Sequence, residues 1–283
     1  MRGTSVRVFI SCDMEGVAGI VDWSQCRPSG GAAYTVGCEL MLAEVNAAIA
    51  GAVAAGADEV LVNDSHGAMF NLDPRALRAP ATYLSGRHKP RYMMQGLEAG
   101  FDAVFMVGYH GSISGVGSVL SHTYNPEVIS AVLLNGRPVG ESGINALVAA
   151  DLGVPIALVT GDAATRDEVV GVAPGCVTVC TKESVTRFAA HHLRPDDSCA
   201  QIEAAAGRAI EAVRAGTVRP PNIGRRATLT VELQTADMAE VASWVKGVER
   251  SGTRNVTIAG DSGCAMFDSF VALTYITRQA GGR

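Results

Sequence analysis

The sequence predicts an α/β protein: a mostly parallel sheet flanked by helices, with a smaller C-terminal α+β subdomain. Short apolar segments alternate with segments of helical spacing along the first two-thirds of the 283-residue chain. Polar clusters follow several of the apolar segments, as at the carboxyl ends of strands in open α/β sheets. With 48% hydrophobic residues, the chain can bury a sizeable core.

The first predicted strand, Val6–Ile10, is β-branched and aromatic, which is typical of a buried central strand. Further strands are expected at residues 59–62, 82–85, 103–108, 155–160 and 176–181. Helices are expected at residues 34–56, 92–99, from about 140 to 152, and at 196–215. Residues 127–134 are expected to form one arm of a hairpin, because the Asn-Gly pair at 135–136 favours a type I′ turn.

The composition changes at Val218–Arg226, which holds two adjacent prolines and three arginines. This change predicts a boundary between an α/β domain at residues 1–217, which carries the candidate metal-binding and catalytic residues described below, and a smaller α+β subdomain at residues 218–283. In the smaller unit we expect strands at 227–234 and 255–259 and helices at 236–250 and 269–278. This part of the sequence shows little recognisable chemistry.

Charge and composition narrow the function classes. A net charge of −5 argues against a nucleic-acid or anionic-membrane partner. The apolar runs are interrupted by glycine and charge, so we expect none to span a bilayer. No basic segment followed by an apolar signal region precedes the first strand, which predicts a cytoplasmic location. The seven scattered cysteines predict neither a disulfide framework nor a thiolate zinc site.

Five candidate metal ligands lie next to predicted strands and helices. In the stretch Asp13-Met14-Glu15, both carboxylates point to the same side if the extended backbone persists. His66 and His110 follow the next predicted strands, and Glu141 opens a predicted helix. Because sites in open α/β sheets lie at the carboxyl ends of strands, we expect these five side chains to converge.

Two imidazoles and three carboxylates favour zinc, manganese or iron over calcium or magnesium. Three carboxylates offset three of the four positive charges on a pair of divalent ions. The set therefore predicts a two-metal hydrolytic centre with a bridging carboxylate and ions about 3.5–4 Å apart. Taken singly, each histidine also fits a hydrogen-bonded loop residue, and Glu141 also fits a favourable charge at a helix start. Their convergence favours the metal site.

His122 is the candidate catalytic residue. It follows the His110 cluster closely, so it could face the metals as general base, general acid or oxyanion stabiliser. A structural hydrogen-bonding role fits the spacing equally well. The remaining histidines, His88, His191 and His192, are expected to be solvent-exposed surface residues.

Five blocks of sequence, in order, resemble the zinc D-aminopeptidases of the dipeptide-permease-operon type. The blocks are Ser11-Cys12-Asp13-Met14-Glu15-Gly16, Asn63-Asp64-Ser65-His66-Gly67, Gly108-Tyr109-His110, His122-Thr123-Tyr124, and Asn135-Gly136 through Gly140-Glu141. The similarity extends from Val6 to about Thr160.

The resemblance implies a binuclear zinc aminopeptidase with two Zn²⁺ ions per subunit. Asp13, Glu15, His66, His110 and Glu141 would be the ligands, with Asp13 as the bridge. His122 corresponds to the histidine that has a catalytic, sometimes nucleophilic, role in the family.

The resemblance also implies a homo-oligomer of stacked rings around a central channel, a homodecamer, which would restrict substrates to short peptides. D-alanyl substrates cleaved from the free N-terminus are expected. An L-specific aminopeptidase, a metal-dependent phosphoesterase and a metal-binding protein without catalysis stay open, although no lysine or arginine accompanies the ligand clusters to hold a phosphate. If the histidine pKa values are unperturbed, activity should fall below pH about 6.5.

Overall fold

A seven-stranded sheet forms the larger part of the structure, a computed structural model that describes residues 5–280. Its strand order is β3-β2-β1-β4-β7-β8-β9. Neighbouring strands are parallel, except that β9 runs antiparallel to β8. The strands are β1 (Val6–Cys12), β2 (Ala57–Asp64), β3 (Thr82–Leu84), β4 (Ala103–Tyr109), β7 (Ile156–Asp162), β8 (Val177–Thr186) and β9 (Ala189–His192). The predicted mostly parallel sheet is confirmed.

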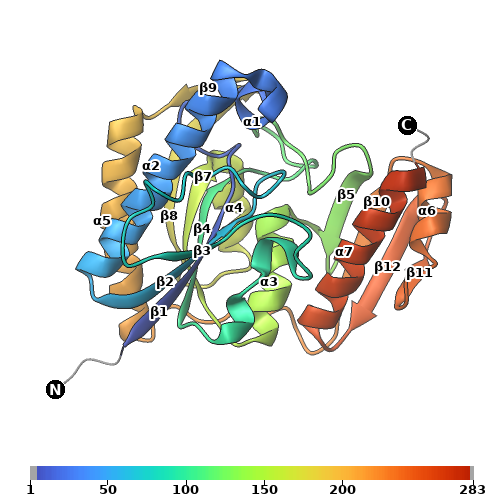
Figure 1. The fold of residues 1–283 in the computed structure, drawn as a ribbon. Coiled ribbons are helices and arrows are strands. Elements are labelled where there is room, and N and C mark those ends of the chain that lie inside the picture. Colours follow the sequence, from blue (N-terminus) through green and yellow to red (C-terminus); the bar gives the residue numbers. More distant parts are fainter. Residues whose placement is uncertain (1–4, 281–283) are drawn as a thin grey trace.

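Helices cover both faces of this sheet. In Figure 1, α2 (Ala32–Ala54) and α5 (Pro195–Arg214) lie along one face, and α3 (Glu141–Asp151) lies on the other. The short helix α4 (Ala163–Val170) packs on β7 and β8. Side chains along β1 point alternately to the two faces of the sheet. Val8 and Ile10 lie in the core under α2 and α5, and Phe9 lies in the core under α3. Cys12 is fully buried in the first of these cores.

The second sheet is antiparallel, with strand order β11-β12-β10-β5-β6. Its strands are β5 (Ile129–Leu134), β6 (Arg137–Pro138), β10 (Ala227–Leu233), β11 (Val248–Arg250) and β12 (Asn255–Gly260). Positive φ angles of 51° at Asn135 and 79° at Gly136 confirm the predicted type I′ turn between β5 and β6. Strands on both sides of the boundary predicted at residue 218 therefore pair in one sheet.

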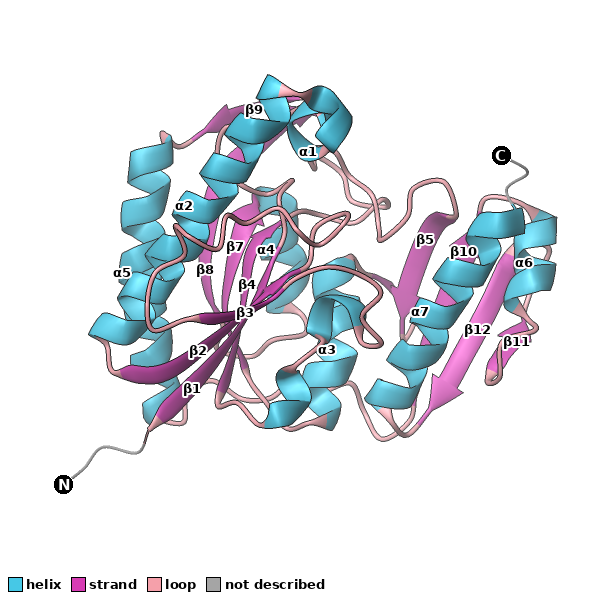
Figure 2. Ribbon diagram, in the orientation of Figure 1, coloured by secondary structure: helices cyan, strands magenta, loops and turns pink. Residues whose placement is uncertain are grey.

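Helices α3 and α7 (Gly263–Ala280) lie between the two groups of strands, as Figure 2 shows. One hydrophobic core continues through them, from Phe9 of the first sheet to Leu229 of the second sheet and Phe270 of α7. Helix α6 (Ala236–Ala242) packs against α7. The two units thus share a core, and the second unit is held close to the strand ends of the first.

Two predicted helices are wrong in part. Residues 92–99 form two separate 3₁₀ turns, Tyr92–Met94 and Leu97–Ala99, because Gly96 adopts a φ of 102° between them. The helix predicted at 236–250 ends at Ala242. The chain then turns through Gly247, with φ of 83°, and pairs with β12 as the edge strand β11.

Helix α2 is long and apolar enough, by length and composition, to cross a membrane, which differs from the expectation that no run would be. Half of its most apolar stretch is buried inside the protein. A Cβ atom on Gly51 of α2 would lie 1.9 Å from the carbonyl oxygen of Glu203 in α5. The helix is apolar because it packs closely against both α5 and the sheet.

Two glycines let the chain segments after β1 and β4 touch. The Gly16 amide donates a hydrogen bond to the Gly108 carbonyl at 2.8 Å. A Cβ atom on Gly16 would lie 1.7 Å from the carbonyl oxygen of Tyr109, and one on Gly108 would lie 2.2 Å from that of Asp13. This contact brings the acidic residues after β1 beside the segment that carries His110.

Gly16→Ala should therefore lower the free energy of unfolding by about 3 kcal/mol, because the added methyl group overlaps backbone that cannot move aside cheaply. Urea unfolding followed by circular dichroism measures the change. Gly171→Ala is the matched control, since its Cβ would lie 3.7 Å from the nearest atom, and it should change stability by less than about 0.5 kcal/mol. Equal effects of the two substitutions would show that the close approach is not a constraint.

Candidate metal centre

The five predicted ligands converge at the carboxyl ends of β1, β2 and β4 and at the start of α3. Strand β1 pairs with β2 on one side and with β4 on the other, so the chain order reverses at β1. Open α/β sheets place their ligand sites at such a switch point. All five residues, and His122, expose 9% or less of their surface. The five candidate ligands are Asp13, Glu15, His66, His110 and Glu141.

Asp13 lies between two histidines. Its Oδ1 is 3.0 Å from His66 Nδ1, and its Oδ2 is 3.5 Å from His110 Nε2. His66 Nδ1 is also 3.0 Å from Glu15 Oε2. On the other side, His110 Nε2 is 3.7 Å from Glu141 Oε1. The sequence prediction that these five side chains come together thus agrees with the geometry, and Asp13 occupies the central position.

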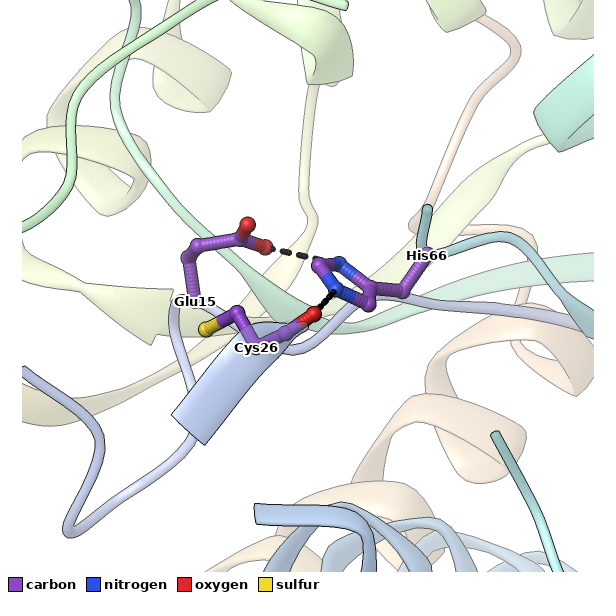
Figure 3. Close-up of side chains that lie close together, drawn as sticks. All are labelled: Glu15, Cys26 and His66. Carbon is purple, nitrogen blue, oxygen red and sulfur yellow. Dashed lines mark hydrogen bonds and ion pairs between the residues drawn. The ribbon is translucent and has the colours of Figure 1, made fainter. Parts of the chain in front are cut away.

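Backbone carbonyls hold the second nitrogen of each histidine. His66 Nε2 donates to the Cys26 carbonyl at 2.7 Å, and His110 Nδ1 donates to the Gly111 carbonyl at 2.9 Å. Because a carbonyl only accepts, these bonds occupy one nitrogen of each ring and leave His66 Nδ1 and His110 Nε2 facing the carboxylates, where each can bind a metal once it is deprotonated. Figure 3 shows Cys26 turning its carbonyl oxygen, and not its sulfur, toward the His66 ring.

The unsatisfied atoms at this position fit a metal. Within residues 5–280, three buried atoms here have no hydrogen-bond partner: Asp13 Oδ2, Glu15 Oε2 and His110 Nε2. Ligand atoms of these three residues all lie within 4.8 Å of one another. Buried polar atoms are rarely left unpaired, and these are the oxygen and nitrogen donors that zinc accepts. The residues present therefore fit the predicted cofactor.

His122 lies beside the ligands and not among the exposed histidines. Its ring stacks on that of His110 with centroids 4.3 Å apart, and its Nε2 is 3.7 Å from Glu141 Oε1. Its Nδ1 donates to the Leu120 carbonyl at 3.0 Å, which leaves a lone pair on Nε2. Burial, together with the charge of His110, lowers the pKa of His122 to about 3, so the ring is neutral at physiological pH.

Burial and the charges of neighbouring groups shift the pKa values of the carboxylates and of His110. The pKa of Glu141 is raised to about 8, first by burial and then by the nearby charge of Asp13. Burial and Glu15 raise the pKa of Asp13. Burial opposes the charged form of His110, but the carboxylates of Glu141 and Asp13 outweigh it and raise the pKa to about 9. The unperturbed histidine pKa assumed from the sequence is therefore wrong for this centre.

Two buried lysines, which sequence reasoning missed, hold the loops that carry the ligands. Lys182 Nζ donates to the carbonyl oxygens of Glu15 at 2.6 Å and Ile20 at 2.7 Å. Lys89 Nζ donates to the Asp64 carbonyl at 2.6 Å, just before the His66 loop. Both lysines are distant in sequence from the loops they hold, so no local pattern could reveal these contacts.

A cavity of about 400 Å³ opens onto the centre. Trp23, whose ring centroid lies 5.3 Å from that of His122, lines it on one side. Helix α7 contributes Val271, Thr274, Tyr275 and Arg278. These positions follow helical spacing, so one face of α7 forms a wall of the cavity. The smaller unit, in which the sequence shows little recognisable chemistry, thus helps to enclose the site.

The remaining histidines lie apart from the centre. His88 and His191 are exposed, as the sequence predicts. His192 is only half-buried and accepts a hydrogen bond from the Gly19 amide at 3.0 Å. His192 is thus a partly exposed residue whose hydrogen bond, not expected from the sequence, ties β9 to the loop after β1.

An α/β sheet with a buried carboxylate and imidazole centre at its switch point, opening into a cavity, defines a metallohydrolase type of site. Residues 6–272 match the peptidase M55 family of D-aminopeptidases. The chain is 33% identical over 279 residues to the D-aminopeptidase of Bacillus subtilis (strain 168), covering 97% of this chain and 98% of the relative. The chain therefore belongs to the D-aminopeptidase family.

A solved structure agrees with this assignment. It is the Zn-dependent D-aminopeptidase DppA from Bacillus subtilis, described as a self-compartmentalizing protease. The two folds superpose with a TM-score of 0.90 at 31% sequence identity, covering 97% of this chain and 98% of that one. The predicted family and the aminopeptidase class are confirmed, and family membership favours the peptidase over the phosphoesterase alternative.

Zinc uptake by the metal-free protein should release protons at pH 7. The metal needs deprotonated ligands, whereas Glu141 and His110 have pKa values of about 8 and about 9 and hold protons at this pH. Apparent zinc affinity should therefore rise from pH 6 to pH 9 and level off above that. Calorimetry in buffers of different ionisation enthalpy should show net proton release on zinc binding at pH 7. Zinc binding without proton release would show that the ligands are already deprotonated in the metal-free protein and would contradict the raised pKa values.

Proposed function

We propose that the chain is a zinc-dependent D-aminopeptidase that cleaves short peptides from the free N-terminus. The observation that supports it most strongly is the buried set of unpaired donor atoms around Asp13, in a chain of the D-aminopeptidase family. The described Zn dependence of the Bacillus subtilis relative supports the choice of metal.

In this proposal each subunit holds two zinc ions with Asp13 between them. Glu15 and His66 would hold one ion, and His110 and Glu141 the other, since these pairs lie on opposite sides of Asp13. When bound, zinc supplies Lewis acidity for polarising the scissile carbonyl and activating water.

His122 would act as the general base. Its Nδ1 bond to the Leu120 carbonyl leaves Nε2 facing the centre, where it can take a proton from the attacking water and return it to the leaving amine. This tautomer disfavours the role of oxyanion stabiliser, because that role needs an N–H on Nε2.

The proposal includes the assembly and the cellular context. The relative's description as self-compartmentalizing supports a homo-oligomer. We propose a homodecamer of stacked rings, which would limit substrates to short peptides, without nucleic-acid or membrane partners and in the cytoplasm. The net charge of −5 agrees with the absence of anionic partners.

A matched panel of D-Ala and L-Ala dipeptides and amides tests the function. Zinc-loaded protein should hydrolyse the D-substrates, chelator treatment should abolish the activity, and added zinc should restore it. Turnover of L-substrates alone would keep the metal chemistry and reject the stereochemical assignment. No turnover of any member would reject the proposed function.

His122→Ala should retain both zinc ions and lose most turnover, by about 10²–10⁴-fold in kcat. The reason is that its Nε2 faces the centre but is not needed to complete the five-ligand set. Metal analysis and steady-state kinetics on the same sample check both parts. Tyr83→Phe, at an exposed strand residue that does not line the cavity, is a suitable control. Full activity in His122→Ala would reject the catalytic assignment.

A further inference from the structure

The cavity combines an acidic floor with a basic rim. Its floor holds the metal-binding carboxylates, and its lining includes three arginines from separate segments, Arg27, Arg87 and Arg278. In the part of the chain that the structure describes, none of the three forms an ion pair. The Arg27 guanidinium lies over the Trp23 ring, 4.7 Å from its centroid, whereas the other two have no aromatic partner in this part.

Arg87 and Arg278 converge on Tyr275. Tyr275 and Arg278 are three residues apart on α7 and share its cavity-facing side. His88, next to Arg87 in the chain, packs edge-on against the Tyr275 ring with centroids 5.0 Å apart. Burial raises the pKa of Tyr275, and the positive charges of Arg87 and Arg278 oppose that rise. The cavity lining and the His88 contact thus place both arginines on the side of the cavity where Tyr275 lies.

The Tyr275 hydroxyl is itself a buried oxygen with no hydrogen-bond partner among residues 5–280. A buried hydroxyl without a partner costs free energy. This donor lines the same cavity as the Arg87 and Arg278 side chains, so one anionic group bound there could accept from the hydroxyl and pair with both cations.

We propose that Arg87, Arg278 and Tyr275 bind the terminal carboxylate of a short peptide whose amino end lies at the metal centre. The substrate class is then free-acid dipeptides and tripeptides, and C-terminally capped peptides are poor substrates. This inference rests on the proposed aminopeptidase function. Glu127 also lines the cavity, but it forms no ion pair with either arginine in the described residues, so both cations stay available.

The volume and polarity of the cavity agree with such a ligand. About 400 Å³ is near the lower end of the range for small-ligand sites, about 300–1,000 Å³. A free peptide carries a cation at one end and an anion at the other, which matches an acidic floor and a basic rim. An amide cap removes the anion and leaves the rim arginines without a partner.

The test compares D-alanylglycine with D-alanylglycinamide on the zinc-loaded enzyme. The free acid should have the higher kcat/KM, by about 10- to 100-fold, the range for hydrogen bonds to a charged group. Arg87→Gln and Arg278→Gln should each remove about tenfold of that preference, and Tyr275→Phe should remove part of it. The ratio of kcat/KM for the free acid to kcat/KM for the amide should fall in all three variants, whereas a general loss of structure would lower both values alike and leave the ratio unchanged.

Arg27→Gln is the matched control, because it removes a rim cation that already lies on Trp23. It should keep the preference for the free acid. Equal kcat/KM for acid and amide in the native enzyme, or a preference that Arg27→Gln abolishes and the other variants keep, would overturn the proposal while leaving the aminopeptidase function intact.

Calorimetric binding separates the two proposals if no peptide is hydrolysed. Zinc-loaded His122→Ala should bind the free acid at least about tenfold more tightly than the amide. Equal affinities would overturn the carboxylate site on their own. Preferential binding that depends on Arg87 and Arg278, without turnover in the native protein, would support the site and reject the proposed peptidase function.

Discussion

The site depends on the close approach of the chain segments after β1 and β4. Only glycine fits at residues 16 and 108, where a Cβ atom would lie within 2.2 Å of a carbonyl oxygen of the opposite segment. This contact fixes Asp13 beside His110 in the interior, where charged groups are costly unless they are paired. The pKa values of Asp13 and Glu141 are raised because burial disfavours their charged forms. Bound cations would relieve this cost.

The surrounding structure holds this arrangement from several directions. Backbone carbonyls orient the three histidine rings, and the buried Lys182 and Lys89 hold the loops that carry Glu15 and His66. In the second unit, helix α7 forms one wall of the cavity. The hydrophobic core that the second unit shares with the first sheet keeps this helix in place. The first unit therefore supplies the chemistry, and the second helps to shape the space in which a substrate lies.

Much of the fold and most of the candidate centre could be predicted from the sequence. Polar residues directly after buried strands mark the edge of a parallel sheet, so Asp13, His66 and His110 could be grouped without coordinates. The type I′ turn at residues 135–136 could also be predicted, because the Asn-Gly pair favours this turn type. These predictions succeeded because each depends on a short stretch of chain.

The remaining features depend on contacts between distant segments. Gly96 and Gly247 interrupt two predicted helices, and pairing with β12 decides the second case. Apolar composition alone could not show that α2 packs against α5. Arg87 and the α7 residues Tyr275 and Arg278 line one cavity although almost two hundred residues separate them in the sequence. No periodic pattern in the sequence predicts that they lie together.

The central claim is that one buried cluster holds two metal ions around Asp13. An anomalous-scattering map of zinc-loaded crystals at the zinc absorption edge tests it most directly. The map should show two peaks per subunit, about 3.5–4 Å apart. Asp13 should lie between the peaks, with His66 beside one and His110 beside the other. A single peak, or peaks at residues outside this cluster, would contradict it.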